Sequence, residues 1–348
     1  MNAGMHMGHG RLFSDAEIEV FMTFSLAPVA GFTNAAFRLM AARGGADLTY
    51  TEMVSAAGLA HGSSPTRHLM EVLPEEGPVA CQLFGSKADE LSFSTREAAA
   101  LNRFVEINLN AGCPVPRIVR EGSGSALVKN PQLVHDLLSA MVAESGGVPI
   151  TLKTRPGPAP DKVLMFELLD AAETACAKGF ILHARFTSQN HGGEVHLDLL
   201  SELVGRAKIP ITGNGGVIDV KTAQAMADTG VASIMVGRGA LSDPYIFSKL
   251  KGRECAHPPA ELLFRENLNA LVALHGQISA HFPSDRLPLL DAWVSGAVRT
   301  HLFRYFAGKP GAGEFRRRLM SLRTVEEILE MCSCQGNFML SLPGAYMI

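Results

Sequence analysis

The stretch Phe104-Val105-Glu106-Ile107-Asn108-Leu109, followed by Asn110-Ala111-Gly112-Cys113-Pro114, decides the fold. Its first half is a short apolar run typical of a β-strand, and its second half places a cysteine just after that strand. Similar runs that end in polar or glycine-rich residues recur between helical segments along most of the chain. This alternation predicts a parallel barrel, in which the residues after each strand carry the chemistry.

The apolar runs predict eight strands, and helix signals fall between them. The strands are expected at 25–29, 48–52, 79–84, 104–108, 150–154, 180–183, 209–212 and 233–236. Helices are expected at 34–42, 87–100, 131–144, 163–177 and 220–228. A strand followed by a helix, repeated eight times, is the (β/α)8 arrangement, so we predict an α/β fold built on a TIM barrel.

The length of 348 residues exceeds the roughly 200 to 250 residues that such a barrel needs. After about residue 250 no strand pattern recurs, and apolar residues at helical spacing follow over 261–280, 292–306 and 314–322. We therefore expect a flexible N-terminal extension over 1–23, a catalytic barrel over 24–250 and a smaller all-helical domain over 251–348.

Composition narrows the class of protein. The chain is 47% hydrophobic and only 19% charged, which supplies a core and excludes a disordered protein. Its six cysteines form no disulfide framework and no metal-ligand spacing, so we expect no metal. No segment reads as a signal peptide or a bilayer span, so we expect a cytoplasmic protein with no membrane partner.

Two glycine-rich loops follow the seventh and eighth predicted strands, at 213–216 and 237–240. Loops at these positions of a barrel commonly bind a phosphate through free backbone N–H groups at a helix start. Simple tight turns are the alternative, but two such loops at matching strand ends favour a phosphorylated ligand.

Basic residues follow the fifth and sixth strands. Lys153 and Arg155 are two residues apart, so strand alternation sends both to one side and leaves a cation over the barrel mouth. Such a cation would stabilise a delocalised anion such as a reduced flavin; otherwise it is a solvated lysine at the rim. His183 and Arg185 could form a hydrogen-bonding pair over a planar ligand. Alternatively, His183 is a core histidine that is bonded to the backbone.

Cys113 has three possible roles: a buried small residue, a nucleophile or a general acid. Glycine before it and proline after it fix its backbone, as a proton donor requires. No His or Asp lies at a spacing that would activate a nucleophile, so we favour proton donation.

Taken together, the motifs resemble those of the tRNA-dihydrouridine synthases, flavin enzymes that reduce uridine in tRNA. The resemblance covers about 25–322 and depends on motifs in the family's order. They are APVAG at 27–31, TEM at 51–53, QLFG at 82–85, NAGCP at 110–114, GSGSAL at 122–127 and GRGAL at 237–241. The chain departs from the family's pattern at Ala184, Phe186, Thr187, Gly216 and Thr300.

The resemblance implies an oxidoreductase with FMN over the barrel mouth and NADPH (or NADH) as the reductant. Hydride would pass from the flavin to carbon 6 of a flipped-out uridine while Cys113 protonates carbon 5. Asn110 and Arg185 would orient the uracil. The residues implied to bind FMN are Pro28, Ala30, Gln82, Lys153, His183, Asn214, Gly215, Gly237 and Arg238.

The helical tail carries a local excess of positive charge that suits tRNA as a partner. Residues 299–323 hold seven Lys and Arg against Glu314 alone, although the whole chain has a net charge of −3. The residues expected to contact RNA are Arg299, Arg304, Arg316 and Arg317. Tyr305 and Phe306 either stack on a base or, as their helical spacing favours, belong to the core.

Two rival functions fit parts of this pattern. A flavin barrel acting on a free pyrimidine, as dihydroorotate and dihydropyrimidine dehydrogenases do, shares the barrel and a similar loop. It needs no basic helical tail. A non-catalytic RNA-binding protein that keeps the fold is the other, and it would bind no flavin.

Overall fold

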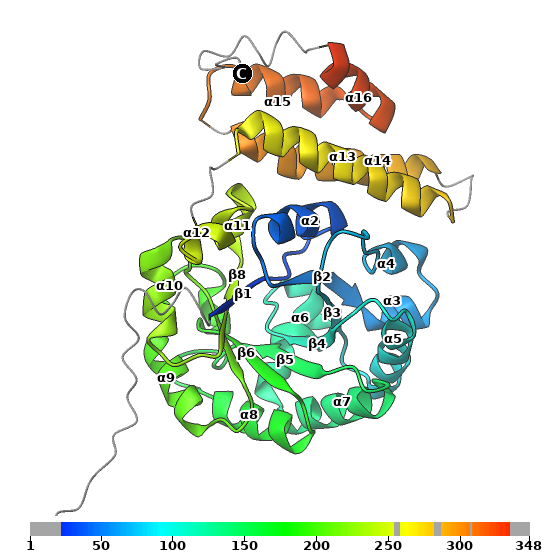
Figure 1. Cartoon of the computed structure of the whole chain (residues 1–348). Helices are drawn as coiled ribbons and strands as arrows, with labels where there is room; N and C mark the ends of the chain where they lie inside the picture. Colours follow the sequence, from blue (N-terminus) through cyan, green and yellow to red (C-terminus); the bar gives the residue numbers. More distant parts are fainter. Residues whose placement is uncertain (1–21, 254–257, 282–286, 307, 335–348) are drawn as a thin grey trace, which may run out of the picture.

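The computed structural model describes residues 22–253, 258–281, 287–306 and 308–334. Within them, eight parallel strands close into a barrel in chain order, which confirms the predicted fold (Figure 1). The strands are β1 (Thr23–Leu26), β2 (Leu48–Ser55), β3 (Val79–Phe84), β4 (Glu106–Ala111), β5 (Ile150–Thr154), β6 (Gly179–His183), β7 (Ile211–Asn214) and β8 (Ser233–Val236).

Helices form the outer layer of the barrel (Figure 1). The longer ones are α2 (Ala35–Arg43), α5 (Ala88–Ala100), α7 (Pro131–Glu144), α8 (Met165–Thr174), α9 (Leu197–Arg206) and α10 (Val220–Ala227). Shorter ones in the connections are α3 (Ala56–Ala60), α4 (Ser64–His68), α6 (Pro116–Arg120), η1 (Gly124–Lys129), η2 (Thr187–Gln189), α11 (Arg238–Ser242) and α12 (Ile246–Leu250).

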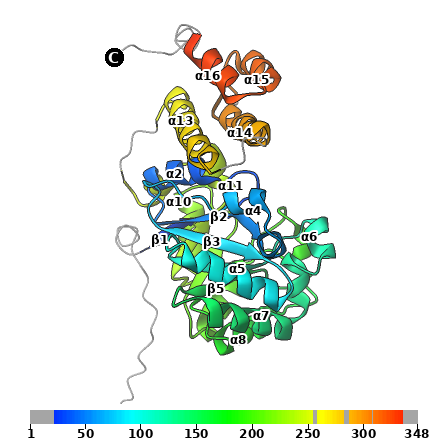
Figure 2. The ribbon, with the colours of Figure 1, turned by 90° about the vertical axis from the view of Figure 1, so that its right-hand side faces the viewer.

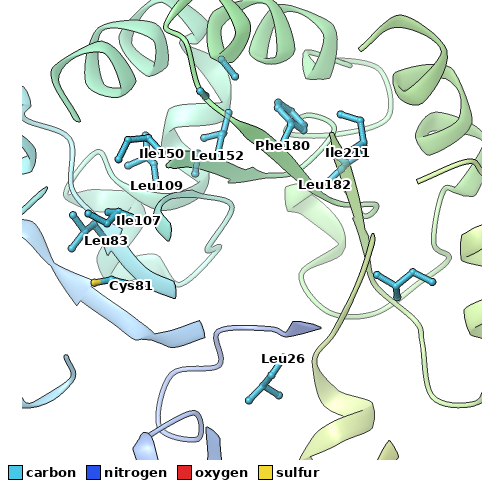
Figure 3. Close-up of a cluster of buried hydrophobic side chains, with 14 of the residues drawn as sticks. Leu26, Cys81, Leu83, Ile107, Leu109, Ile150, Leu152, Phe180, Leu182 and Ile211 are labelled. Carbon is cyan, nitrogen blue, oxygen red and sulfur yellow. The ribbon is translucent and has the colours of Figure 1, made fainter. Parts of the chain in front are cut away.

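Residues of the strands alternate between the helical layer and the barrel interior, as the period of two requires. On β4, Ile107 and Leu109 are fully buried in the apolar layer outside the barrel, together with Leu152 and Leu182 of β5 and β6 (Figure 3). The intervening residue Asn108 faces the interior, where it is bonded to residues of β3 and β5. The layer between the barrel and its surrounding helices is therefore apolar, whereas the barrel interior is partly polar.

The bounds of five strands (β1, β2, β4, β6 and β7) differ from the prediction by one to three residues. β1 begins two residues earlier than expected and ends before Pro28, and β7 begins after Pro210 rather than at Ile209. Proline has no N–H to donate to a sheet, so both strands exclude it. β4 runs on to Ala111, because its polar residues point inward instead of marking the end of the strand.

A second cluster of helices packs on α2, beside the barrel (Figures 1 and 2). It comprises α13 (Ala260–Ser279), α14 (Leu287–His301), η4 (Leu302–Phe306), α15 (Ala312–Ser321) and α16 (Val325–Cys334). Helix α2 lies between the two units: Phe37 packs in the barrel core, and Leu39 and Met40 pack in the core of the helical cluster. Sequence periodicity anticipated α13 to α15 but missed α16.

Some expectations fall outside the described residues. The N-terminal extension over 1–23 lies there except for its last two positions, and Thr23 already belongs to β1. In the part of the chain that the structure describes, no helix is both long enough and apolar enough to cross a bilayer.

Candidate active site

The residues singled out in the barrel lie on or just after the C-terminal ends of its strands. Gln82, Asn110 and Lys153 are on β3, β4 and β5, and His183 and Asn214 are the last residues of β6 and β7. The remaining ones follow the strands: Pro28 and Ala30 after β1, Cys113 after β4, Arg185 after β6, Gly215 after β7, Gly237 after β8, and Arg238 as the first residue of α11.

The loop that carries Cys113 is held from three sides. The Asn110 side-chain oxygen accepts from the backbone N–H groups of Gly112 and Cys113, both at 3.0 Å. Arg155 donates through Nε to the carbonyl of Gly112 at 2.7 Å, and Ser125 donates its N–H to the carbonyl of Cys113 at 2.9 Å. The position of the thiol is therefore determined by residues of β4, the loop after β5 and η1.

The half-buried Cys113 thiol is kept protonated by its surroundings. Burial raises its pKa above the usual value, and the Val115 amide and the charges of Arg155 and Lys153 offset part of that rise. A group with this environment is a thiol at neutral pH, and the nearby cations would stabilise the thiolate left after it gives up its proton.

Lys153 lies inside the barrel, with Nζ donating to the Asn214 side-chain oxygen at 2.9 Å. Burial, with a smaller contribution from the charge of Arg155, lowers the pKa of Lys153 to about 7. Asn214 is fixed in turn, since its side-chain NH2 donates to the Met235 carbonyl at 2.8 Å. The lysine is thus fixed in position but easily deprotonated, and an anion placed beside it would raise its pKa and restore its charge.

Arg155 does not share the role of Lys153, although the spacing suggested a common one. β5 ends at Thr154, and the Arg155 side chain is only 1% exposed. Besides Gly112, its guanidinium donates to the carbonyls of Arg185 and Phe186 at 3.2 and 3.1 Å. It ties the loop after β4 to the loop after β6.

His183 and Arg185 form the pair that their spacing predicted. Arg185 Nη1 lies 3.4 Å from His183 Nε2, and Arg185 Nε donates to the Gly193 carbonyl at 3.1 Å. Burial and then the charges of Lys153, Arg155 and Arg185 lower the pKa of His183 well below its usual value. The imidazole is therefore neutral, with one donor and one acceptor nitrogen; because Arg185 can only donate, Nε2 is the acceptor.

Gly215 lies directly against this pair. A Cβ at that position would approach the His183 ring to 3.0 Å and Arg185 Nη1 to 3.3 Å, and the residue has φ +122°. Only glycine fits there without displacing the pair. The loop after β8 is adjacent to β1, because a Cβ on Gly237 would lie 3.6 Å from Ala27.

Positive charge accumulates at this end of the barrel. His191 lies in the loop after β6, and burial, followed by the charges of Arg155, Arg238, Lys153 and Arg185, lowers its pKa. Within the described residues, none of these four is in an ion pair with a carboxylate. The described part of the chain also contains no group of three or more His, Cys, Asp or Glu arranged to hold a metal ion.

Sequence reasoning missed the polar groups in the barrel interior. Tyr50 and Thr151 each donate to Oε1 of Glu106, at 2.7 and 2.5 Å. Glu106 is the first residue of β4, and nothing in the apolar pattern distinguished it from a solvated end of the strand. Only strand alternation, applied to 106, 108 and 110 together, would have placed the three polar residues on one face.

The arginines of the helical unit differ in their surroundings. Arg299 is half-buried and donates to the Leu322 carbonyl at 2.8 Å. The exposed Arg304 lies with its guanidinium 4.7 Å from the ring centre of Phe32, in the loop after β1. Arg316 and Arg317 are exposed on α15, whereas Tyr305 and Phe306 are buried in the core.

The chain is similar to known proteins over nearly its whole length. The sequence model of a family described as dihydrouridine synthase matches residues 25–339. A probable tRNA-dihydrouridine synthase of Treponema pallidum is 28% identical over 89% of this chain and 93% of its own. The tRNA-dihydrouridine synthase B of Pseudomonas putida is 30% identical over 86% of this chain and 87% of its own. The similarity therefore spans both the barrel and the helical unit.

Proposed function

The chain belongs to the dihydrouridine synthase family, and from this premise we propose that it reduces uridines in tRNA to 5,6-dihydrouridine. The observation that carries the proposal is that Cys113, in a loop held by Asn110 and Arg155, lies at the same end of the barrel as Lys153, Arg185 and Arg238. A reduction of a carbon–carbon double bond needs a hydride and a proton on two adjacent atoms, and the thiol supplies the second.

The residues at the strand ends fit FMN. Lys153, Arg185 and Arg238, which have no carboxylate partner among the described residues, suit a ligand with a phosphate and an anionic ring. Gly215 lets the backbone lie close to His183 and Arg185, which a side chain there would displace. Gln82, Lys153 and His183 would hold the ring, and Asn214, Gly215, Gly237 and Arg238 the phosphate, with Pro28 and Ala30 at the rim. When bound, FMN would supply the hydride, after its own reduction by NADPH or NADH.

Cys113 is the proton donor in this proposal. Burial keeps its sulfur protonated, and the Asn110 and Arg155 hydrogen bonds fix its loop, so the proton is delivered from one place. Lys153 and Arg155 then stabilise the thiolate. A proton from solvent restores the thiol before another turnover.

Arg185 is the better candidate for holding the uracil. Its Nη1 contact with His183 is long at 3.4 Å, which leaves donors for a carbonyl oxygen of the base. Asn110 already uses both halves of its amide, since its NH2 contacts Gln82 and the Met53 sulfur and its oxygen accepts twice. It would have to exchange the weak sulfur contact, at 3.1 Å, for the base.

tRNA would lie across the helical unit and the open end of the barrel. Arg316 and Arg317 are exposed on α15, and Arg304 reaches the loop after β1 at the same end as Cys113. These residues would contact phosphates without reading sequence. Arg299 is expected to act mainly by supporting α15 through Leu322.

The test is nucleoside mass spectrometry of tRNA from cells with and without the gene, together with absorbance of the purified protein. We expect a loss of dihydrouridine in the deletion strain and a flavin spectrum in the protein. An unchanged dihydrouridine content in a strain with no second enzyme would contradict the proposal. A colourless protein would favour a non-catalytic RNA-binding role, and turnover of free uracil or orotate would favour a pyrimidine enzyme.

A further inference from the structure

A continuous chain of hydrogen bonds runs through the barrel interior from Glu106 to the Cys113 loop. Thr151 donates to Glu106 at 2.5 Å, and Asn108 donates through its NH2 to Thr151 Oγ1 at 2.7 Å. Gln82 donates through its NH2 to the Asn108 side-chain oxygen at 2.7 Å, and Asn110 does so to the Gln82 oxygen at 2.8 Å. The four residue-to-residue steps from Glu106 to Asn110 span about 13 Å of β4.

The chemistry at both ends fixes the direction of every bond in this chain. Backbone N–H groups only donate, so the Asn110 atom that meets Gly112 and Cys113 must be its oxygen. A carboxylate only accepts, so the Thr151 and Tyr50 hydroxyls must point their hydrogens at Glu106. Between these ends, each amide has a single orientation that leaves no donor facing a donor.

Water does not provide a substitute for these bonds. Gln82 and Asn108 are 0% exposed, and Asn110 is 6% exposed. A flipped Asn110 amide would turn its NH2 toward two backbone N–H groups, which releases the loop that carries Cys113. The amide orientation at Asn110 is therefore set by these two N–H groups and reinforced, through the chain, by the acceptor at its far end.

We propose that Glu106 is a positioning residue: its carboxylate, acting through Thr151, Asn108 and Gln82, orients the Asn110 amide that holds the Cys113 loop. The proposal extends the proposed function, because it makes proton delivery by Cys113 depend on a carboxylate at the opposite end of the barrel. The hydrogen bonds themselves do not depend on what the protein reduces.

The test compares the alkylation rate of Cys113 in the flavin-loaded protein and in three variants, by iodoacetamide and peptide mass spectrometry. Thr151→Val cuts the chain with little change of shape, and Glu106→Gln replaces the carboxylate by a group that can also donate. Thr212→Val is the matched control, because its hydroxyl lies 2.6 Å from Ser233 Oγ on neighbouring strands, outside the chain. The exposed Cys176 reports the reactivity of the reagent in each sample.

We expect Cys113 to react about fivefold faster in Thr151→Val, which is the effect of losing one net hydrogen bond, and faster in Glu106→Gln as well. Thr212→Val should match the unaltered protein. Equal Cys113 rates in all four proteins would overturn the proposal. A rise in Thr151→Val with none in Glu106→Gln would overturn the role assigned to the carboxylate.

A second measurement separates positioning from a merely structural role. Reduction of the bound flavin by NADPH should lose less of its rate in Thr151→Val than dihydrouridine formation does. Equal losses in both half-reactions would contradict positioning. If no protein, the unaltered one included, forms dihydrouridine, the proposed function fails, and the alkylation rates still decide the role of Glu106.

Discussion

Replacing Gly124 by alanine should both destabilise the protein and displace Cys113. Gly124 has φ +60°, and a Cβ there would lie 2.7 Å from the Cys113 carbonyl oxygen and 3.2 Å from the Cys113 Cβ. Both contacts are with parts of the chain that cannot rotate away. The close contact with the loop that carries Cys113 thus explains why residue 124 of the GSGSAL motif is a glycine.

The magnitude has two parts, which a matched glycine separates. Gly146 has φ +58° and nothing within 4 Å of a built Cβ, so Gly146→Ala carries the backbone cost alone. An alanine in the left-handed conformation destabilises the folded state by about 1–2 kcal/mol. Alanine also lowers the conformational entropy of the unfolded chain, which stabilises the folded state by about 0.4–1 kcal/mol, so the net loss is about 1 kcal/mol. For Gly124→Ala the overpacking adds about 1–3 kcal/mol.

The assay is urea unfolding of both variants and the unaltered protein, with dihydrouridine formation measured on each folded sample. We expect Gly124→Ala to lose more unfolding free energy than Gly146→Ala, and to lose activity that Gly146→Ala keeps. If the two variants were equally stable and equally active, the argument that Gly124 fixes the Cys113 loop would be refuted.

Three further predictions concern charge. The pKa of Lys153 is about 7 in the folded protein against 10.5 when unperturbed, so the unfolded chain binds more protons between these pH values. The free energy of unfolding of the flavin-free protein should therefore increase as pH rises from 7 to 10. In urea titrations, Lys153→Met should remove this increase. Arg38→Met should lower the free energy of unfolding by about 3–5 kcal/mol, because it leaves the Glu76 carboxylate buried without its partner at 2.7 Å. Arg43→Met breaks the exposed pair with Glu75 and should lower it by less than about 1 kcal/mol. Similar losses of unfolding free energy in the two variants would show that burial of the first pair is not decisive. Arg317→Ala should weaken tRNA binding and lower the slope of log affinity against log salt by about 1, and an unchanged slope in filter binding would remove Arg317 from the interface.

The barrel could be predicted because its strands are apolar runs with turn residues at both ends. Apolar residues such as Ile107 and Leu109 face the helical layer, and the loops after the strands hold the glycines and basic residues. Strand ends were harder to place, since an apolar Pro28 or Pro210 reads as strand by hydrophobicity but cannot donate to the ladder. Helix α9 was not predicted, because its N-cap residue, His196, is not one of the usual capping residues and makes no side-chain capping hydrogen bond.

The candidate site could be predicted by position but not by contact. Cys113, Lys153 and His183 stand at strand ends, which the sequence shows. That Arg155 would turn to backbone carbonyls, or that Glu106 and Tyr50 would meet across the barrel, depends on side chains from strands far apart in the chain. Such pairings follow from barrel closure and register, which single-sequence patterns do not contain.

The most direct test of the account is single-turnover reduction of unmodified tRNA by the fully reduced protein, with the unaltered chain and Cys113→Ala compared at equal flavin content. Prior reduction removes the nicotinamide step, so the rate reports proton delivery. The account predicts that Cys113→Ala binds flavin normally and forms dihydrouridine at least about 100-fold more slowly. Equal rates in the two proteins would contradict it.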